Sequence, residues 1–206
     1  MLFRSHSSAD LEARGISVVP TEFVNRYAQA NLAELCEARG WGEIVIKPCI
    51  AGNAFGVRRF DLLQASRDAR AYLCELAGDR DAMIQPFLRE VEREGERSLV
   101  FIGGEFSHAT RKELFSTGPA GGQGLETVHD SHPAEIAFAQ RVCDALPAGA
   151  LYARVDLVLA ATGWLVMEVE LIEPVLFFRF APASADLLAD VLLRKLNDLT
   201  GDFCAG

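Results

Sequence analysis

Four charged residues stand close together in segment 154–171 of the chain, which is otherwise mostly apolar. Arg154 and Asp156 are two residues apart, and so are Glu168 and Glu170. Because successive side chains of a strand point to opposite faces, each pair shares one face of its strand. Residues 161–163 are typical of a turn, which would place Asp156 opposite Glu168 and Arg154 opposite Glu170.

Facing carboxylates destabilise a sheet unless a cation lies between them. Mg²⁺ suits this position because it favours one or two carboxylates together with waters and substrate phosphates. The alternative is a hairpin whose wet face carries charges, with Arg154 and Glu170 as a simple cross-strand pair. The intervening residues are expected to form one continuous apolar face, comprising Val155, Leu157, Leu159, Leu165, Met167, Val169 and Leu171.

A second group of charges is cationic and follows a predicted strand. Lys47 ends the run EIVIKP, directly before a loop with Gly52 and Gly56. A strand-end lysine above a glycine-containing loop suits phosphate binding, although a solvated strand end is the plain alternative. The glycines follow the lysine, so the segment is not a P-loop. The further cations considered are Arg58 and Arg59 in the same loop and the pair Arg111 and Lys112.

The segment MIQPFLREVEREGERS joins an apolar strand to an acidic run. The backbone of Gln85 to Leu88 is a candidate to read an adenine edge, with Phe87 or Leu88 against the ring. Glu92 or Glu96 is a candidate for the ribose hydroxyls. An ordinary strand followed by a solvated charge run is the alternative.

Hydrophobic periodicity and turn residues along the chain predict an α+β fold that mixes hairpins with helices. Helices are expected after a Ser8 cap to Gly15, over 22–40, 61–78 and 133–146, and from a Ser184 cap to Gly201. Strands are expected over 16–21, 43–48 and 82–88, with a hairpin over 98–112 that turns at Gly103 and Gly104. Residues 115–131 are expected to form a long loop.

Composition narrows the possible classes of function. The net charge of −9 disfavours nucleic acid as a partner, because its phosphates require a basic surface. The five cysteines lack C-x-x-C spacing, which argues against a disulfide framework and a zinc site. We find no apolar run long enough for a membrane span and no signal-peptide core, so a cytoplasmic protein without membrane contact is expected.

Taken together, and in this order, these features resemble the ATP-grasp fold, in which two α+β lobes close on ATP. The resemblance is nearest to the glutathione synthetase-like branch, which includes a ligase that closes the cycloserine ring, and it runs from about residue 15 to the carboxyl terminus. It implies ATP and Mg²⁺ as cofactors, with Mn²⁺ as an alternative ion.

The resemblance also implies roles for the residues. Lys47 would bind the α and β phosphates under loop 52–58, while Gln85, Phe87 and Leu88 would form the adenine hinge and Glu96 or Glu92 would hold ribose. Arg111 or Lys112 would meet the terminal phosphate, and Arg154 the reacting acyl phosphate. Asp156 and Glu168 would hold one Mg²⁺, and Glu168 and Glu170 a second; Glu170 stands where the family often has Asn.

The implied activity is that of an ATP-dependent ligase joining a small-molecule carboxylate to an amine or thiol through an acyl phosphate. Residues 1–20 would be the remnant of a linker from a missing N-terminal domain, 21–86 the small lobe, and 87–206 the large lobe with the metal-binding hairpin. A homo-oligomer, or a partner that supplies the missing lobe, is the expected assembly. A non-catalytic or truncated nucleotide-binding module is the alternative function.

Overall fold

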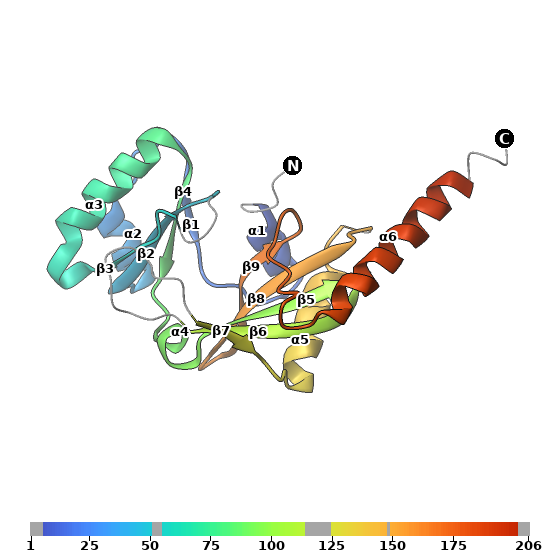
Figure 1. The fold of residues 1–206 in the computed structure, drawn as a ribbon. Helices are drawn as coiled ribbons and strands as arrows, with labels where there is room; N and C mark the ends of the chain where they lie inside the picture. Colours follow the sequence, from blue (N-terminus) through green and yellow to red (C-terminus); the bar gives the residue numbers. More distant parts are fainter. Residues whose placement is uncertain (1–5, 51–54, 114–124, 148, 202–206) are drawn as a thin grey trace.

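Two antiparallel sheets organise the protein, as the computed structural model in Figure 1 shows for residues 6–50, 55–113, 125–147 and 149–201. The small lobe has the strand order β1-β4-β2-β3, and the large lobe has β7-β6-β5-β8-β9. The fold is therefore α+β, as predicted. The small-lobe strands are β1 (Glu22–Val24), β2 (Glu43–Pro48), β3 (Arg58–Asp61) and β4 (Ala82–Pro86). The large-lobe strands are β5 (Glu96–Ile102), β6 (Glu105–Glu113), β7 (Leu125–Val128), β8 (Tyr152–Ala160) and β9 (Gly163–Glu170).

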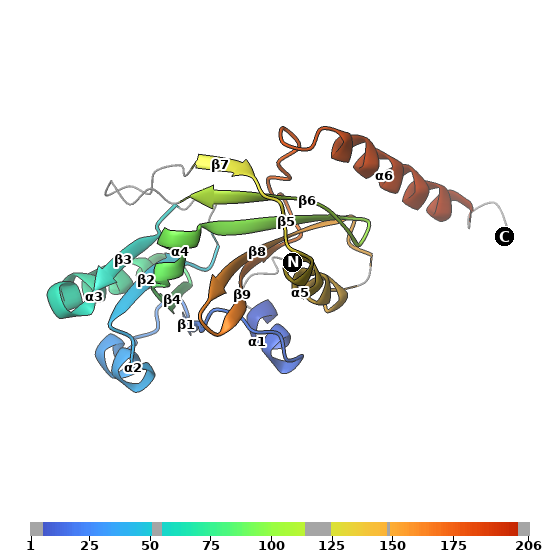
Figure 2. The same ribbon diagram turned by 90° about the horizontal axis from the view of Figure 1, so that it is seen from below.

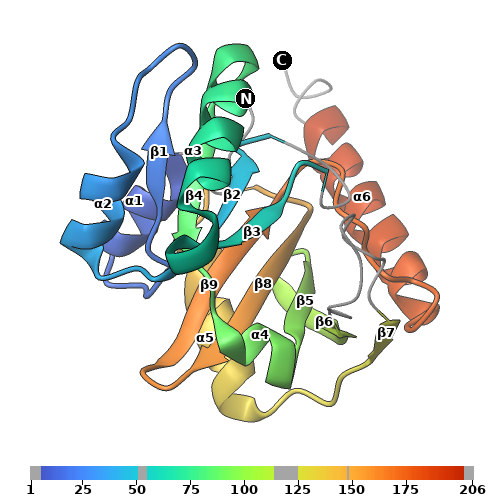
Figure 3. The same cartoon turned by 90° about the vertical axis from the view of Figure 1, so that its left-hand side faces the viewer.

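Helices α2 (Leu32–Arg39) and α3 (Leu62–Asp79) cover the outer face of the small-lobe sheet (Figure 3). Asp61 caps α3 by accepting a hydrogen bond from the backbone N–H of Leu63 at 3.0 Å. Ile44 and Ile46 are fully buried against these helices. Because side chains alternate along β2, Glu43, Val45 and Lys47 lie on the other face of the sheet.

The large-lobe sheet has two differently covered faces (Figure 2). Helices α1 (His6–Ala13) and α5 (Pro133–Asp144) lie on one face, over a core that includes Phe101 and Leu157. Leu11, Ile16 and Val18 belong to this core, so the described part of the expected linker 1–20 packs into the large lobe. The other face bears the charged residues considered below, together with α4 (Arg89–Glu94) and α6 (Ala183–Gly201).

Several element predictions are corrected by tertiary pairing. Residues 22–24 form β1, which pairs with β4, so the helix predicted over 22–40 is only α2. Residues 16–21 form no strand; Val18 makes an isolated bridge to Val166.

The predicted loop 115–131 contains β7 at 125–128, while 114–124 lie outside the described residues. The loop after β2 ends in β3 at Arg58.

The two predicted serine caps are also wrong. Helix α1 already includes Ser8. Helix α6 begins at Ala183, and the Ser184 hydroxyl instead contacts Ser107 Oγ at 2.7 Å. A stripe of α6 centred on Val191 packs on the sheet, whereas Leu192, Leu193 and Leu196 are exposed as the helix extends away from the body (Figure 1). Within the described residues, no helix is long and apolar enough to cross a membrane.

Candidate active site

The hairpin β8–β9 brings its four charged residues into the predicted register. Asp156 pairs with Glu168, and Arg154 pairs with Glu170. The pairing then shifts, because Leu157 pairs with Val166 and leaves Met167 as the extra residue of a β-bulge. The bulge divides the expected continuous apolar face. Leu165 and Met167 pack with Val158 rather than with Val155 and Leu157, which corrects that prediction.

Arg154 is the cation that lies between the acidic residues in this structure. Its Nε and Nη2 donate to the two carboxylate oxygens of Asp156 at 2.9 and 2.8 Å, and its Nη1 lies 3.0 Å from Glu170 Oε2. This is the cross-strand pair of the plain alternative. Burial alone would lower the pKa of Arg154, but the neighbouring Asp156 and Glu170 raise it above its usual value. Asp156 is only 1% exposed, and the pairing with Arg154 offsets the cost of burying its carboxylate.

Glu96 and Lys112 extend the cluster onto β5 and β6. Ser98 of β5 pairs with Asp156 on one side and Thr110 of β6 on the other, and Glu96 pairs with Lys112. Residues two apart share a face, so all these side chains lie on the face that bears Asp156. Burial, followed by the nearby charge of Asp156, raises the pKa of Glu96 to about 7, although Lys112 opposes the shift.

Arg111 lies on the opposite face of the sheet from this cluster. It pairs with Arg97, whose side chain stacks on Trp164, and its Nη2 lies 3.7 Å from Glu113 Oε1. Of the two cations predicted for a terminal phosphate, the structure therefore brings Lys112 to the acidic residues and leaves Arg111 away from them. A bulge between Val100 and Phe101 decides this, because it shifts the hairpin pairing by one residue.

The charge balance at this face suits a cation. Four carboxylates, those of Glu96, Asp156, Glu168 and Glu170, lie on this face with the two cations Arg154 and Lys112. Burial is the main cause of the raised pKa of Glu96, and the negative charge of Asp156 adds to it. Thr110 Oγ1 is buried on the same face without a hydrogen-bond partner. No group of three His, Cys, Asp or Glu among the described residues is placed to hold a metal ion unaided. Ligands from a bound phosphate would complete such a site, as is usual for Mg²⁺.

Two apolar clusters bound the charged area on this face of the sheet. Val100 and Ile102 pack with Phe177 and Val191 on the side of α6. Val158 packs with Val91 of α4 and with Val19 on the side of the small lobe. Apolar walls lower the local dielectric and strengthen interactions between the charges they enclose.

The small lobe presents Lys47 on the face opposite its helices. The register pairs Lys47 with Met83, and Val45 with both Gln85 and Arg59, so these side chains share that face. Gln85 is buried and donates from Nε2 to Thr21 Oγ1 at 2.8 Å. Figure 1 shows this sheet between α3 and the large lobe, which places its uncovered face toward the large lobe.

Some of the residues predicted to bind adenine and ribose make contacts with other protein groups. The backbone N–H of Phe87 donates to Glu43 O at 2.9 Å, and the Phe87 ring lies 3.5 Å from the Arg59 guanidinium carbon. Glu92 accepts a hydrogen bond from Arg59. Leu88 is the N-cap of α4. For ribose, Glu96 lies within the charged face, whereas Glu92 is bound at the lobe junction.

Only part of the loop predicted to bind phosphate lies within the described residues. Gly52 lies outside the described residues. Gly56 has φ +72°, and a Cβ there would come within 3.1 Å of Pro48, so both the backbone conformation and the space favour glycine. Tyr72 donates to Gly56 O at 2.6 Å, and Arg58 lies over the Tyr72 ring at 4.2 Å. These contacts fasten the base of the loop to α3.

Sequence reasoning missed Ser98, Thr110 and His108, which share the charged face. His108 accepts or shares hydrogen bonds with Ser107 and Ser184, and its Nε2 lies 2.8 Å from Leu176 O. The alternation of Ser98 with Leu99, and of His108 with Ala109, was the available signal. The bulge hides it, since unshifted pairing outward from Gly103 and Gly104 would set His108 opposite Leu99 and thus on the other face.

The chain is similar to known ligases in sequence and in structure, although no family model matches it. The cycloserine biosynthesis protein DcsG of Streptomyces lavendulae is 32% identical over 207 residues, which cover 92% of this chain and 68% of that protein. The crystal structure of D-cycloserine synthetase DcsG superposes with a TM-score of 0.87 at 28% identity, over 95% of this chain and 70% of that one.

More distant structures share the fold. The D-alanine–D-alanine ligase from Bacillus anthracis complexed with ATP has a TM-score of 0.68 at 19% identity, covering 95% of this chain and 66% of that one. The ATP-grasp ligase PsnB complexed with a precursor variant, Mg and ADP has a TM-score of 0.66 at 16% identity, covering 92% and 58%. The chain therefore belongs to the ATP-grasp ligases, on the branch of the D-cycloserine synthetase DcsG.

Proposed function

We propose that this ATP-grasp ligase binds ATP with Mg²⁺ between its lobes and joins a small-molecule carboxylate to an amine or thiol through an acyl phosphate. One observation carries the proposal: Glu96, Lys112, Arg154 and Asp156 converge on one sheet face with Glu168 and Glu170. The ATP complex of the Bacillus anthracis ligase and the Mg and ADP complex of PsnB, which share the fold, support the choice of ligands.

We assign the cationic residues to phosphate binding and the acidic residues to metal binding. Lys47 on the small lobe and Lys112 on the large lobe offer ammonium groups to phosphate oxygens. Asp156, Glu168 and Glu170 would hold Mg²⁺, which supplies charge neutralisation to the phosphates during phosphoryl transfer. Mn²⁺, which has similar oxygen ligands, is an alternative ion. Glu96 would hold the ribose hydroxyls, and Gln85 and Leu88 would border adenine.

The proposed reaction has two steps. A carboxylate oxygen of the substrate attacks the γ-phosphorus of ATP, the bond from phosphorus to the bridging oxygen breaks, and ADP leaves. The amine or thiol then attacks the acyl carbon, phosphate leaves with the bonding electrons, and the nucleophile loses its proton. Arg154 lies on the same face and stabilises negative charge on the acyl phosphate. Positioning and electrostatic stabilisation account for most of such catalysis.

The boundary between the lobes is proposed near residues 86 and 87, because β4 ends at Pro86 and α4 begins at Arg89. A homo-oligomer, or a partner that supplies further substrate contacts, is the proposed assembly. A cytoplasmic setting is proposed because ATP is the expected substrate.

The test is turnover with a trap for the intermediate. The protein is incubated with ATP, Mg²⁺ and a panel of amino acids and dipeptides, and phosphate release is measured with and without hydroxylamine. We expect one class of carboxylate to stimulate phosphate release and to give a hydroxamate. Turnover that yields AMP and diphosphate, or phosphate release that no carboxylate stimulates, would contradict the proposal.

A further inference from the structure

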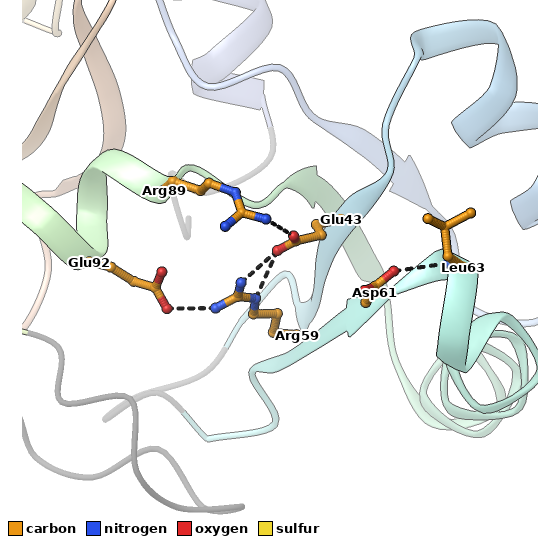
Figure 4. Close-up of polar contacts among 6 residues, drawn as sticks. All are labelled: Glu43, Arg59, Asp61, Leu63, Arg89 and Glu92. Carbon is orange, nitrogen blue, oxygen red and sulfur yellow. Dashed lines mark hydrogen bonds and ion pairs between the residues drawn. The ribbon is translucent and has the colours of Figure 1, made fainter.

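A network of four charged side chains joins the two lobes beside the hinge (Figure 4). Glu43 Oε2 accepts from Arg59 Nη2 at 2.6 Å and from Arg59 Nε at 3.1 Å. The other oxygen of Glu43 accepts from Arg89. Arg59 Nη1 donates to Glu92 Oε1 at 2.6 Å, so Arg59 binds two carboxylates at once.

The members of the network come from different lobes. Glu43 and Arg59 are neighbours in the small-lobe sheet, on β2 and β3. Arg89 and Glu92 belong to α4, whose Val91 is buried with Val158 of the large-lobe sheet. Rotation of the lobes relative to one another would therefore separate Arg59 from Glu92 and Glu43 from Arg89.

Arg59 is also in contact with the hinge itself. Its guanidinium carbon lies 3.5 Å from the centroid of the Phe87 ring, and the Phe87 N–H donates to Glu43 O at 2.9 Å. The aromatic face and Glu43 already order the Arg59 side chain, so its pairing with Glu92 costs less conformational entropy than an isolated surface pair. The hydrogen bond from Arg59 lowers the pKa of Glu43, which keeps this carboxylate charged.

We propose that Arg59 is a positioning residue, which acts through Phe87, Glu43 and Glu92 to hold the lobes in the arrangement that receives the nucleotide. The inference rests on the proposed function for its link to ATP, and on the described contacts alone for its effect on the lobes. It predicts that ATP affinity depends on side chains that do not touch the phosphates or the metal.

The first test is a double-mutant cycle read as KM for ATP against kcat. Arg59→Gln and Glu92→Gln should each raise the KM for ATP about fivefold with little change in kcat. The double variant should be no weaker than Arg59→Gln alone, because both changes remove the same link. The matched control is Arg39→Gln, which breaks a comparable surface pair with Glu22 inside the small lobe and should leave KM unchanged.

The second test needs no nucleotide, so it stands even if the proposed function fails. Cys74 is exposed on α3, and a Leu193→Cys, Cys204→Ser variant adds a second labelling site on exposed α6. The distance distribution between spin labels at these sites should broaden in Arg59→Gln and stay unchanged in Arg39→Gln.

The proposal would be overturned by an unchanged distance distribution in Arg59→Gln, by effects of the two single variants that multiply, or by an equal change in Arg39→Gln. Broadening in a protein that binds no ATP would uphold the role of Arg59 in lobe arrangement and refute only the proposed function.

Discussion

Arg154 joins the acidic residues of the β8–β9 hairpin through two ion pairs. It binds both Asp156 and Glu170, and a buried carboxylate such as Asp156 would otherwise be strongly destabilising. The spacing of these residues in the sequence predicted the register, but it left open whether a metal ion or Arg154 neutralises them. In the structure Arg154 contacts both Asp156 and Glu170, and a metal ion at these carboxylates stays a prediction. Burial, followed by the charge of Asp156, raises the pKa of Glu96 beside them.

The neighbouring cations Arg111 and Lys112 on β6 should differ sharply in their effect on ATP-dependent turnover. Because Lys112 pairs with Glu96 and Arg111 points to the opposite face, Lys112→Met should lower kcat for ATP-dependent phosphate release about a hundredfold or more. Arg111→Met is the matched control and should retain activity within about threefold. Steady-state phosphate release measures both, and a greater loss in Arg111→Met would contradict the assigned faces.

The pKa of Glu96 predicts a pH effect on the stability of the metal-free protein. Its pKa in the folded state, about 7, is above the ordinary value of 4.5, so the folded protein binds this proton more tightly than the unfolded chain. The resulting stability is fully present below pH 4.5 and is lost as the pH rises through 7. Glu96→Gln should therefore gain up to about 3 kcal/mol over the wild type above pH 7.

Urea unfolding in EDTA from pH 4 to 8 checks this expectation for Glu96. The free energies of unfolding of the two proteins should diverge as the pH rises. A constant difference across that range would show that Glu96 titrates normally.

At the level of elements, the sequence predicted the long periodic segments better than the short ones. The strand EIVIKP, the helix α3 and the hairpin β8–β9 agree with prediction because their apolar patterns are strong. The short strands β1 and β7 were missed, since β1 is held by pairing with the distant β4, and β7 pairs with β6 across residues 114–124. The two bulges could not be counted from the sequence, which is why the choice between Arg111 and Lys112 stayed open.

The turn between β5 and β6 offers a test of how α6 is docked. Gly103 and Gly104 both have positive φ, but a Cβ on Gly103 would lie 3.0 Å from Val191 Cγ2, whereas nothing lies within 4 Å at Gly104. Each alanine substitution should cost about 1 kcal/mol through backbone strain. Gly103→Ala should cost about 1 kcal/mol more because it crowds Val191. Thermal unfolding of both variants checks this, and equal losses would mean that α6 does not press on the turn.

At the scale of the whole molecule, the charged residues proposed to bind ATP and Mg²⁺ come from both lobes. Lys47 lies on the uncovered face of the small-lobe sheet, and the acidic cluster lies on one face of the large-lobe sheet. The order of motifs along the chain predicted the ATP-grasp fold, because each motif is local. The contact of Arg59 with Glu92 between the lobes was not predicted, since it joins residues 33 positions apart through side chains of ordinary surface type.

The central claim is that the carboxylates of the large lobe bind a metal ion together with a triphosphate. Calorimetric titration with ATP, with Mg²⁺ and with EDTA, tests it most directly in the wild type and in Glu168→Gln. We expect binding in Mg²⁺ to be at least about tenfold tighter than in EDTA, and this difference to vanish in Glu168→Gln. Equal affinity for ATP under all of these conditions would contradict the account.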